Sequence, residues 1–184
     1  MKIVASIALA VALGCAAVAA QTTKPTKATP GPEQKRIAYF AGQWNFEGEA
    51  KDSPLGPGGK ITGTETCEWF AGGFQLVCRT KGSGPEGPGT GMGVIGYDPG
   101  RKAYTYYAVS SHGDNIFIRG QVQDKVWTWT DEATIEGKKM KIVATVTEES
   151  PTSSSFKLEA SVDGGPMTVI EQGKSTKVGK PTSN

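Results

Sequence analysis

The stretch CEWFAGGFQLVC, residues 67–78, places two cysteines on either side of a double glycine. Glycine suits both central positions of a hairpin turn that needs positive φ, so Gly72 and Gly73 are the expected bend. With that centre and a four-residue loop, Cys67 lies directly opposite Cys78, within reach of a disulfide. A three-residue loop would shift the register by one and leave two buried thiols instead. The spacing therefore predicts a β-hairpin joined by a Cys67–Cys78 disulfide.

The same hairpin assigns side chains to the two faces of its strands. Successive side chains alternate between faces, so Trp69 shares an apolar face with Cys67 and Leu76. That face is expected to point into the protein, because threonines occupy most of the other one. Glu65 falls on the inward face as well, and a carboxylate is unusual there because burial disfavours its charged form.

Residues 1–20, MKIVASIALAVALGCAAVAA, have the layout of a secretory signal peptide. A lysine precedes an uncharged apolar run that ends in small residues, and cleavage is expected after Ala20. Two alternatives stay open. The run could remain as a membrane anchor, or Cys15 could be lipidated, since Ala12 to Cys15 loosely resembles a lipobox. The sequence thus predicts a periplasmic or secreted protein with no transmembrane span after processing.

The rest of the chain divides into three parts by composition. Residues 21–32 are rich in Thr, Lys and Pro and are expected to form a flexible linker, and residues 173–184 a basic tail. Residues 33–172 suit a single domain and hold all 18 acidic residues of the chain against 14 of its 20 Lys and Arg. A mildly acidic domain lacks the basic face of a nucleic-acid binder, so nucleic acid is not expected as a partner.

Apart from one short helix after Pro32, the domain is expected to be all β. Alternating apolar and polar residues predict strands separated by turns rich in Gly, Pro and Asp. The predicted strands are 43–51, 60–70, 74–81, 91–98, 101–110, 114–122, 125–131, 138–149, 153–162 and 166–172. Tight turns pair each strand with the next, so we expect an antiparallel up-and-down barrel of about 8–10 strands. A sandwich of two sheets is the alternative.

Several segments taken together resemble a known family. The segments are IAYFAGQWNFEGEA, CEWFAGGFQLVCRTKG, GMGVIGYDPGRKAYTYYAVSSHGD, FIRGQVQDKVWTW and EASVDGGPMTVIEQGKSTK, which span most of residues 35–178. The most specific marks are Gly42-Gln43-Trp44, Gly72-Gly73, and Gly96-Tyr97-Asp98 before a tyrosine-rich strand. This order resembles a family of secreted bacterial proteins called domain of unknown function 1579. The resemblance implies a lipocalin-like (calycin) barrel and brings no settled activity with it.

The inward side chains of the predicted strands are largely aromatic. Barrels of this size hold either packed side chains or one small ligand, so the aromatics predict a pocket for a small apolar molecule or a filled core. The predicted ligand-binding residues are Trp44, Phe46, Glu65, Trp69, Met92, Tyr104, Tyr106, Trp127 and Trp129. The glycine-rich loops 52–59 and 82–90 are expected to flank the mouth of the barrel.

Two residues are candidates for catalysis. His112, the only histidine, falls in a predicted turn and would need a neighbour such as Asp114 to orient it. Glu65 could act as an acid inside the barrel, with Arg119 or a tyrosine hydroxyl as its partner, or it could lie wet at the rim. Serines in a nucleophile motif are lacking, and with the cysteines paired neither a metal site nor a cofactor is expected.

These features favour a secreted barrel that binds or carries a small hydrophobic or amphipathic molecule. One alternative is a ligand-free structural or protein-interaction module. Another is a small isomerase or hydrolase that uses Glu65 or His112. Both stay open at this point, because an apolar interior serves packing and binding alike.

Overall fold

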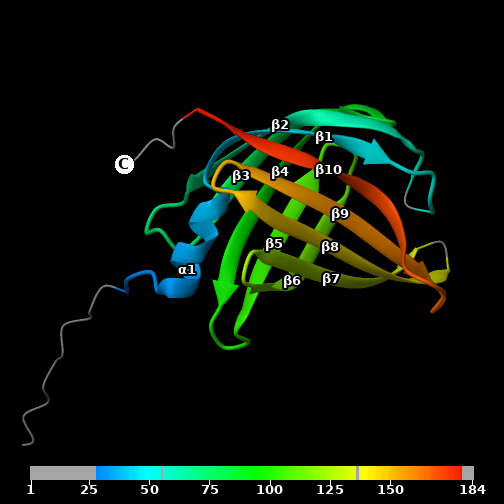
Figure 1. The fold of residues 1–184 in the computed structure, drawn as a ribbon. Helices are drawn as coiled ribbons and strands as arrows, with labels where there is room; N and C mark the ends of the chain where they lie inside the picture. The colour runs from blue at the N-terminus through cyan, green and yellow to red at the C-terminus, as the bar shows by residue number, and fades with distance from the viewer. Residues whose placement is uncertain (1–27, 55, 136, 180–184) are drawn as a thin grey trace, which may run out of the picture.

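The computed structural model describes residues 28–54, 56–135 and 137–179, which form a closed antiparallel β-barrel (Figure 1). Each strand pairs with its neighbours in sequence, and the first strand, β1 (Gly42–Ala50), pairs with the last, β10 (Thr168–Val178). The predicted up-and-down barrel is therefore confirmed, and the alternative of a two-sheet sandwich is wrong. The predicted signal peptide and Cys15 lie outside the described residues. Among the helices of the described ranges, none has the length and apolar character to cross a membrane.

The described residues contain ten strands and one short helical segment, close to the predicted boundaries. Besides β1 and β10, the elements are α1 Pro32–Arg36, η1 Ile37–Phe40, β2 Gly59–Trp69, β3 Leu76–Gly84, β4 Gly87–Asp98, β5 Ala103–Ser110, β6 Asn115–Gln123, β7 Val126–Ile135, β8 Lys138–Ser150 and β9 Ser153–Val162. Turn residues separate them as the composition predicts. Asp124, for example, adopts a φ of 53° in the two-residue connection between β6 and β7, where a tight hairpin turn needs positive φ.

The β2–β3 hairpin has the predicted register. Cys67 is the partner of Cys78 across the two strands, their Cα atoms lie 4.0 Å apart, and their sulfur atoms form a disulfide. Gly72 and Gly73 have φ values of 100° and 75°, and the backbone N–H of Gly73 donates to the carbonyl of Phe70 at 3.0 Å. The double glycine thus supplies the two positive φ angles that the turn requires.

The helical segment closes one end of the barrel. Ile37 of η1 is completely buried, and the indole Nε1 of Trp44 donates to the carbonyl of Phe40 at 2.9 Å. Arg36 forms an ion pair with Glu148 of β8 at 2.6 Å. The buried side chain of Ile37, the carbonyl of Phe40 and the ion pair of Arg36 therefore hold the helical segment against the strand ends.

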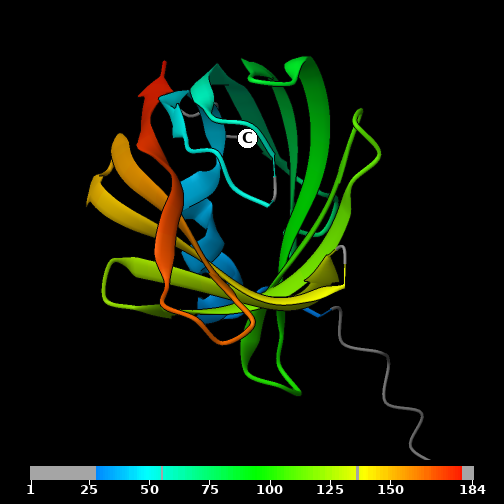
Figure 2. The ribbon, with the colours of Figure 1, turned by 90° about the vertical axis from the view of Figure 1, so that its right-hand side faces the viewer.

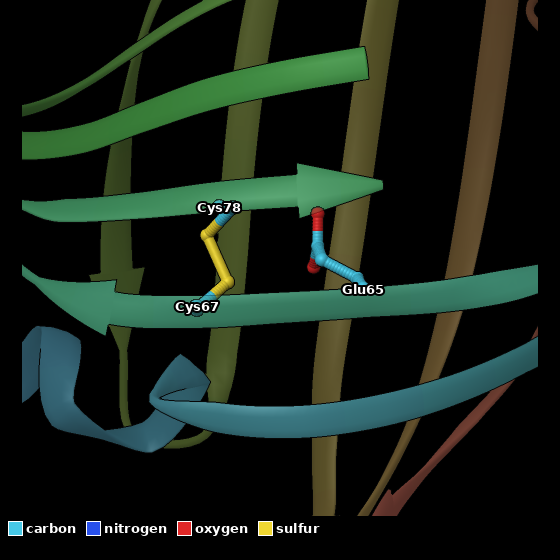
Figure 3. A group of neighbouring side chains, drawn as sticks. All are labelled: Glu65, Cys67 and Cys78. Carbon is cyan, nitrogen blue, oxygen red and sulfur yellow. A yellow bond between two sulfur atoms is a disulfide. The ribbon is translucent and has the colours of Figure 1, made fainter. Parts of the chain in front are cut away.

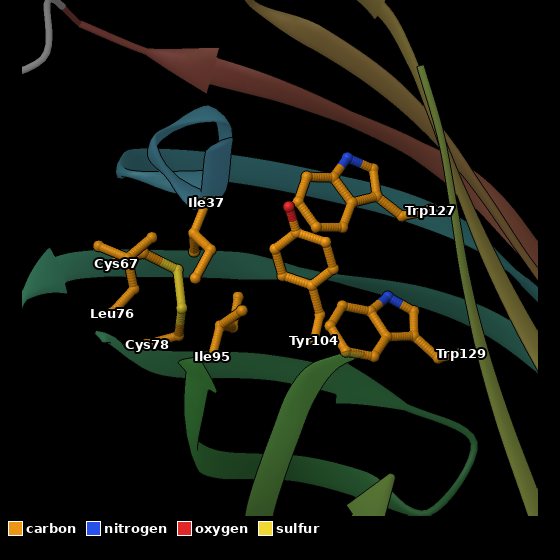
Figure 4. Close-up of a cluster of buried hydrophobic side chains, with 8 residues drawn as sticks. All are labelled: Ile37, Cys67, Leu76, Cys78, Ile95, Tyr104, Trp127 and Trp129. Atoms are coloured by element: carbon orange, nitrogen blue, oxygen red, sulfur yellow. A yellow bond between two sulfur atoms is a disulfide. The ribbon is translucent and has the colours of Figure 1, made fainter. Parts of the chain in front are cut away.

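A dense hydrophobic core lies directly beneath this segment (Figure 4). Its buried members are Ile37, Cys67, Leu76, Cys78, Ile95, Tyr104, Trp127 and Trp129. The ring of Trp127 lies 4.9 Å from that of Phe40 and 4.7 Å from that of Tyr104, in edge-on arrangements, and it stacks against Trp129 at 6.2 Å. Edge-on and offset ring pairs add to the stability that burial provides. The closed half of the barrel is therefore filled by side chains.

Two residues that we expected to be buried in the interior are exposed instead. Met92 is 41% exposed, because the inward positions of β4 are occupied by Gly93 and Ile95. The ring of Tyr106 lies across Gly93, where an added Cβ would come within 2.7 Å of it, so this glycine makes room for the tyrosine. Trp69 stands at the last position of β2, at the end of the barrel wall, and is 40% exposed.

Strand β10 also continues past residue 172, where we expected the basic tail to begin. Lys174 lies opposite Glu47 of β1, and Lys177 lies opposite Trp44. The ammonium of Lys177 sits 4.6 Å from the Trp44 ring and donates to the carbonyl of Tyr39 at 3.0 Å. Cation–π contact and this hydrogen bond explain why a basic segment joins the sheet instead of remaining a solvated tail.

Candidate functional site

A cavity of about 400 Å³ occupies the end of the barrel opposite the helical segment. Figure 2 shows the strands surrounding the interior, with the connection between β1 and β2 (cyan) folded over it. That connection and the turn between β3 and β4 contribute Pro57 and Glu86 to the lining. The expectation that the two glycine-rich segments flank the mouth is therefore correct, although the second is mostly strand.

The wall of the cavity combines apolar side chains with glycine backbone. Phe46, Ile61, Leu158 and Ile170 supply the apolar surface. The glycines of the lining are Gly56, Gly82, Gly84, Gly87, Gly89 and Gly91. Because glycine carries no side chain, strands that would otherwise fill the interior leave it open here. The cavity has the size and the apolar character of a site for a small molecule.

The predicted ligand-binding residues divide between this cavity and the packed core. Phe46 lines the cavity, whereas Trp127 and Trp129 pack in the core of the closed half. Tyr104 belongs to the same core, and Trp44 is buried beneath the helical segment. The aromatic residues therefore lie chiefly in the packed half of the barrel, and small residues line the cavity in the other half.

Glu65 lies inside the barrel, next to the disulfide (Figure 3). The hydroxyl of Thr80, a residue of the cavity wall, donates to its Oε1 at 3.2 Å. Burial raises the pKa of Glu65, and this hydrogen bond offsets only part of the rise. The pKa of Tyr106 is also raised, first by burial and then by the charge of Glu65. Glu65 is thus an interior acid whose partner is Thr80, and the expectation of Arg119 or a tyrosine hydroxyl is not met by any hydrogen bond in the described residues.

The carboxylate of Glu65 and the sulfur atoms of Cys67 and Cys78 lie within 4.8 Å of one another. Three such atoms would resemble a metal-binding group if the cysteines were thiolates. In the disulfide the sulfurs have lost that capacity, since metal binding needs the deprotonated thiol. This cluster therefore does not fit a metal ion.

Replacing Glu65 with glutamine is expected to stabilise the protein increasingly as the pH rises. The folded pKa lies above the unfolded one, so the wild type has its full stability below the unfolded pKa and loses some as the carboxyl ionises at higher pH. Glutamine cannot ionise, so the gain over the wild type should reach about 1–3 kcal/mol at alkaline pH, the usual penalty for a poorly paired buried group. Urea unfolding across a pH series measures it, with Glu68→Gln on the exposed face of β2 as the control. A gain that does not change with pH would contradict this account.

A second interior acid, Glu171, was not among the predicted site residues. It lies in the cavity wall, opposite Ala50 of β1 and Leu158 of β9. Burial raises its pKa as well. Alternation in the sequence places Ala50 on the inward face of β1. The inward position of Glu171 follows from this only once β1 is known to pair with β10.

His112 stands at the mouth of the cavity in the turn between β5 and β6. Its Nδ1 is 3.8 Å from a carboxylate oxygen of Glu86. Asp114 accepts a hydrogen bond from the hydroxyl of Ser110 at 2.8 Å and does not orient the imidazole as we had expected. His112 therefore has an acidic neighbour, but within the described residues its imidazole forms no hydrogen bond with a serine hydroxyl.

This geometry defines a lipocalin-like β-barrel that is packed at one end and hollow at the other. The chain belongs to the family described as "Protein of unknown function (DUF1579)", whose family model matches residues 29–172. The resemblance seen in the sequence is therefore confirmed. No curated protein matches the chain in sequence.

Solved structures of low sequence identity align with this chain. Rv2717c from M. tuberculosis is 12% identical with a TM-score of 0.57, and the alignment covers 82% of this chain and 99% of that one. A de novo designed fluorescence-activating β-barrel is 20% identical with a TM-score of 0.43, covering 77% and 96%. The barrel EF1p2_mFAP2b, solved bound to DFHBI, is 11% identical with a TM-score of 0.44, covering 79% and 98%. At 12% identity the likeness to Rv2717c concerns the fold alone.

Proposed function

We propose that this protein is a secreted barrel that binds or carries a small hydrophobic or amphipathic molecule in the cavity at its open end. The observation that carries the proposal is the cavity of about 400 Å³ between Phe46, Ile61 and Leu158. Binding sites for small molecules are concave, mostly apolar and supplied with a few polar groups, and this one has acids and a histidine beside its apolar wall. The packed half opposite gives the site a rigid base.

Secretion is supported by the disulfide. Structural disulfides persist in the periplasm and outside the cell, and they are rare where thiols are kept reduced. The leader of residues 1–20, with cleavage after Ala20, accounts for export. Lipidation at Cys15 is the alternative route, and the mass of the exported protein distinguishes a chain that begins at Gln21 from a lipidated one.

Filling the cavity is expected to weaken ligand binding strongly without unfolding the barrel. Gly84 faces the cavity, and a Cβ added there would meet Ile61 at 3.4 Å, an ordinary contact. Gly84→Leu should therefore weaken binding of the neutral probe N-phenylnaphthylamine by at least about tenfold, because the leucine takes the space of the ligand. Fluorescence titration measures the change, and circular dichroism checks the fold.

The matched control is Lys81→Leu, on the exposed outer face of the same strand, which should bind the probe as the wild type does. Equal affinity of the wild type and Gly84→Leu would overturn the proposed site. Native mass spectrometry of exported protein adds a direct test: a mass that disappears on denaturation identifies a captured ligand. If the wild type neither retained a ligand nor bound the probe, the ligand-free module would replace this proposal.

A further inference from the structure

Glu171 holds a specific place in the cavity wall. It lies on β10 beside the bulged stretch Val169–Glu171, with Ala50 opposite it on one side and Leu158 on the other. Its neighbour Ile170 also lines the cavity. A carboxylate is thus set among apolar groups near the mouth. The polar end of a bound molecule would lie beside this carboxylate once the apolar part had entered the cavity.

No hydrogen bond or ion pair reaches the carboxylate of Glu171 from any residue that the structure describes. The nearest candidate by position is Lys51 at the rim, which is exposed and forms no ion pair in the described ranges. A buried charge without a partner is costly, so burial disfavours the ionised form of the carboxyl group. Burial accordingly raises the pKa of Glu171. A cation brought in by a ligand would remove this cost.

The other charged groups near the cavity do not supply an internal cation. Glu86 and His112 face each other at the mouth, together with Lys51, and Glu65 lies deeper beside Thr80. The cations at the closed end are already engaged: Arg36 pairs with Glu148, and Lys177 sits on the ring of Trp44. The interior therefore offers acids and apolar surface, which suits a positively charged amphipathic molecule better than an anionic one.

We propose that the cavity selects lipophilic amines, with the protonated nitrogen paired to Glu171 and the apolar body against Phe46 and Leu158. This inference rests on the proposed function, since it names the ligand class of the same site. Because the amine favours ionised Glu171, its binding lowers the pKa that burial raises in the empty site. The preference for amines arises because hydrogen bonds and ion pairs between charged partners in a partly buried site are stronger than hydrogen bonds between neutral groups.

The test compares octylamine, octanol and octanoate, which share one alkyl chain and differ in the head group. Isothermal titration calorimetry with the full mature chain should rank octylamine first and octanoate last. Glu171→Gln is expected to lower the affinity for octylamine by about tenfold or more and to leave that for octanol unchanged. Glu49→Gln removes the same charge from the exposed outer face of β1 and should change neither affinity.

The pH series adds an independent readout. Acidification should weaken octylamine binding as Glu171 takes up its proton, while octanol binding stays constant, and the Glu171→Gln variant should lose this dependence. Equal affinity for octylamine and octanol, or no selective loss in Glu171→Gln, would overturn the amine preference while the cavity still bound ligands. Tightest binding of octanoate would overturn it as well. If none of the three ligands bound while N-phenylnaphthylamine did, the amine preference alone would be overturned; if the probe also failed to bind and no ligand was retained, the proposed function would fail and this inference with it.

Discussion

Replacing Trp127 with alanine is expected to lower the free energy of unfolding by about 3–5 kcal/mol, the range found when a large buried aromatic side chain is removed. The side chain is completely buried and lies between the rings of Phe40 and Tyr104. Its Nε1 also donates to Glu148 at 2.6 Å, and Arg36 lies 5.1 Å over its ring. Alanine would leave a cavity in the core and remove the ring contacts of the barrel wall with Phe40 and Arg36 of the helical segment.

Urea unfolding of the two proteins, followed by circular dichroism, measures the effect. Trp69→Ala is the matched control, because Trp69 is 40% exposed at the end of β2, and it should cost far less. Trp127→Phe should fall between the two, since phenylalanine retains ring packing but cannot donate to Glu148. Similar losses for Trp127→Ala and Trp69→Ala would show that the closed half is not the stabilising core.

Removing the disulfide by the double substitution of Cys67 and Cys78 with alanine is expected to cost about 2–3 kcal/mol of unfolding free energy. The bond closes a short loop with a sequence separation of 11, and short loops restrict the unfolded chain less than long ones do. Both cysteines are also buried in the core, so the substitution loses packing at the same time. Denaturant midpoints of the wild type and the double variant give the difference.

Dithiothreitol provides the internal control for this prediction. It should lower the stability of the wild type towards that of the variant and leave the variant unchanged, because the variant has no disulfide to reduce. A wild type whose denaturant midpoint is insensitive to reduction, once its thiols are shown to be free, would contradict a stabilising role for this bond. Binding of N-phenylnaphthylamine by the folded double variant should be retained, because neither cysteine lines the cavity.

Much of the fold follows from patterns that span only neighbouring residues. The double glycine at 72–73 needs only its own backbone preferences and the spacing of Cys67 and Cys78 to define the hairpin. The ten strands follow in the same way, since turn residues and alternation mark each one. Because each strand pairs with the next, only the first and last strands have an unpaired edge. Pairing these two strands with each other closes the barrel and removes both edges.

The candidate site was predicted less well, because it depends on which residues meet across the interior. Aromatic side chains suit both a pocket wall and a core, and alternation cannot tell the two apart. The apolar stretch of β4 could present either Met92 or Gly93 inward, and only the ring of Tyr106 lying across Gly93 decides the choice. Glu171 became visible as a cavity residue only once β10 was paired with Ala50 of β1.

By itself, the sequence determined an all-β chain of consecutive hairpins, the Cys67–Cys78 disulfide and an inward Glu65, because these depend on local backbone geometry and on a period of two. The tertiary structure decided where the aromatics gather, which end is closed by the helical segment, and where the cavity with Glu171 lies. The physical reason is that packing is a relation between side chains distant in sequence. Bulky residues fill the interior where strands bring them together, and it stays open where glycines meet instead.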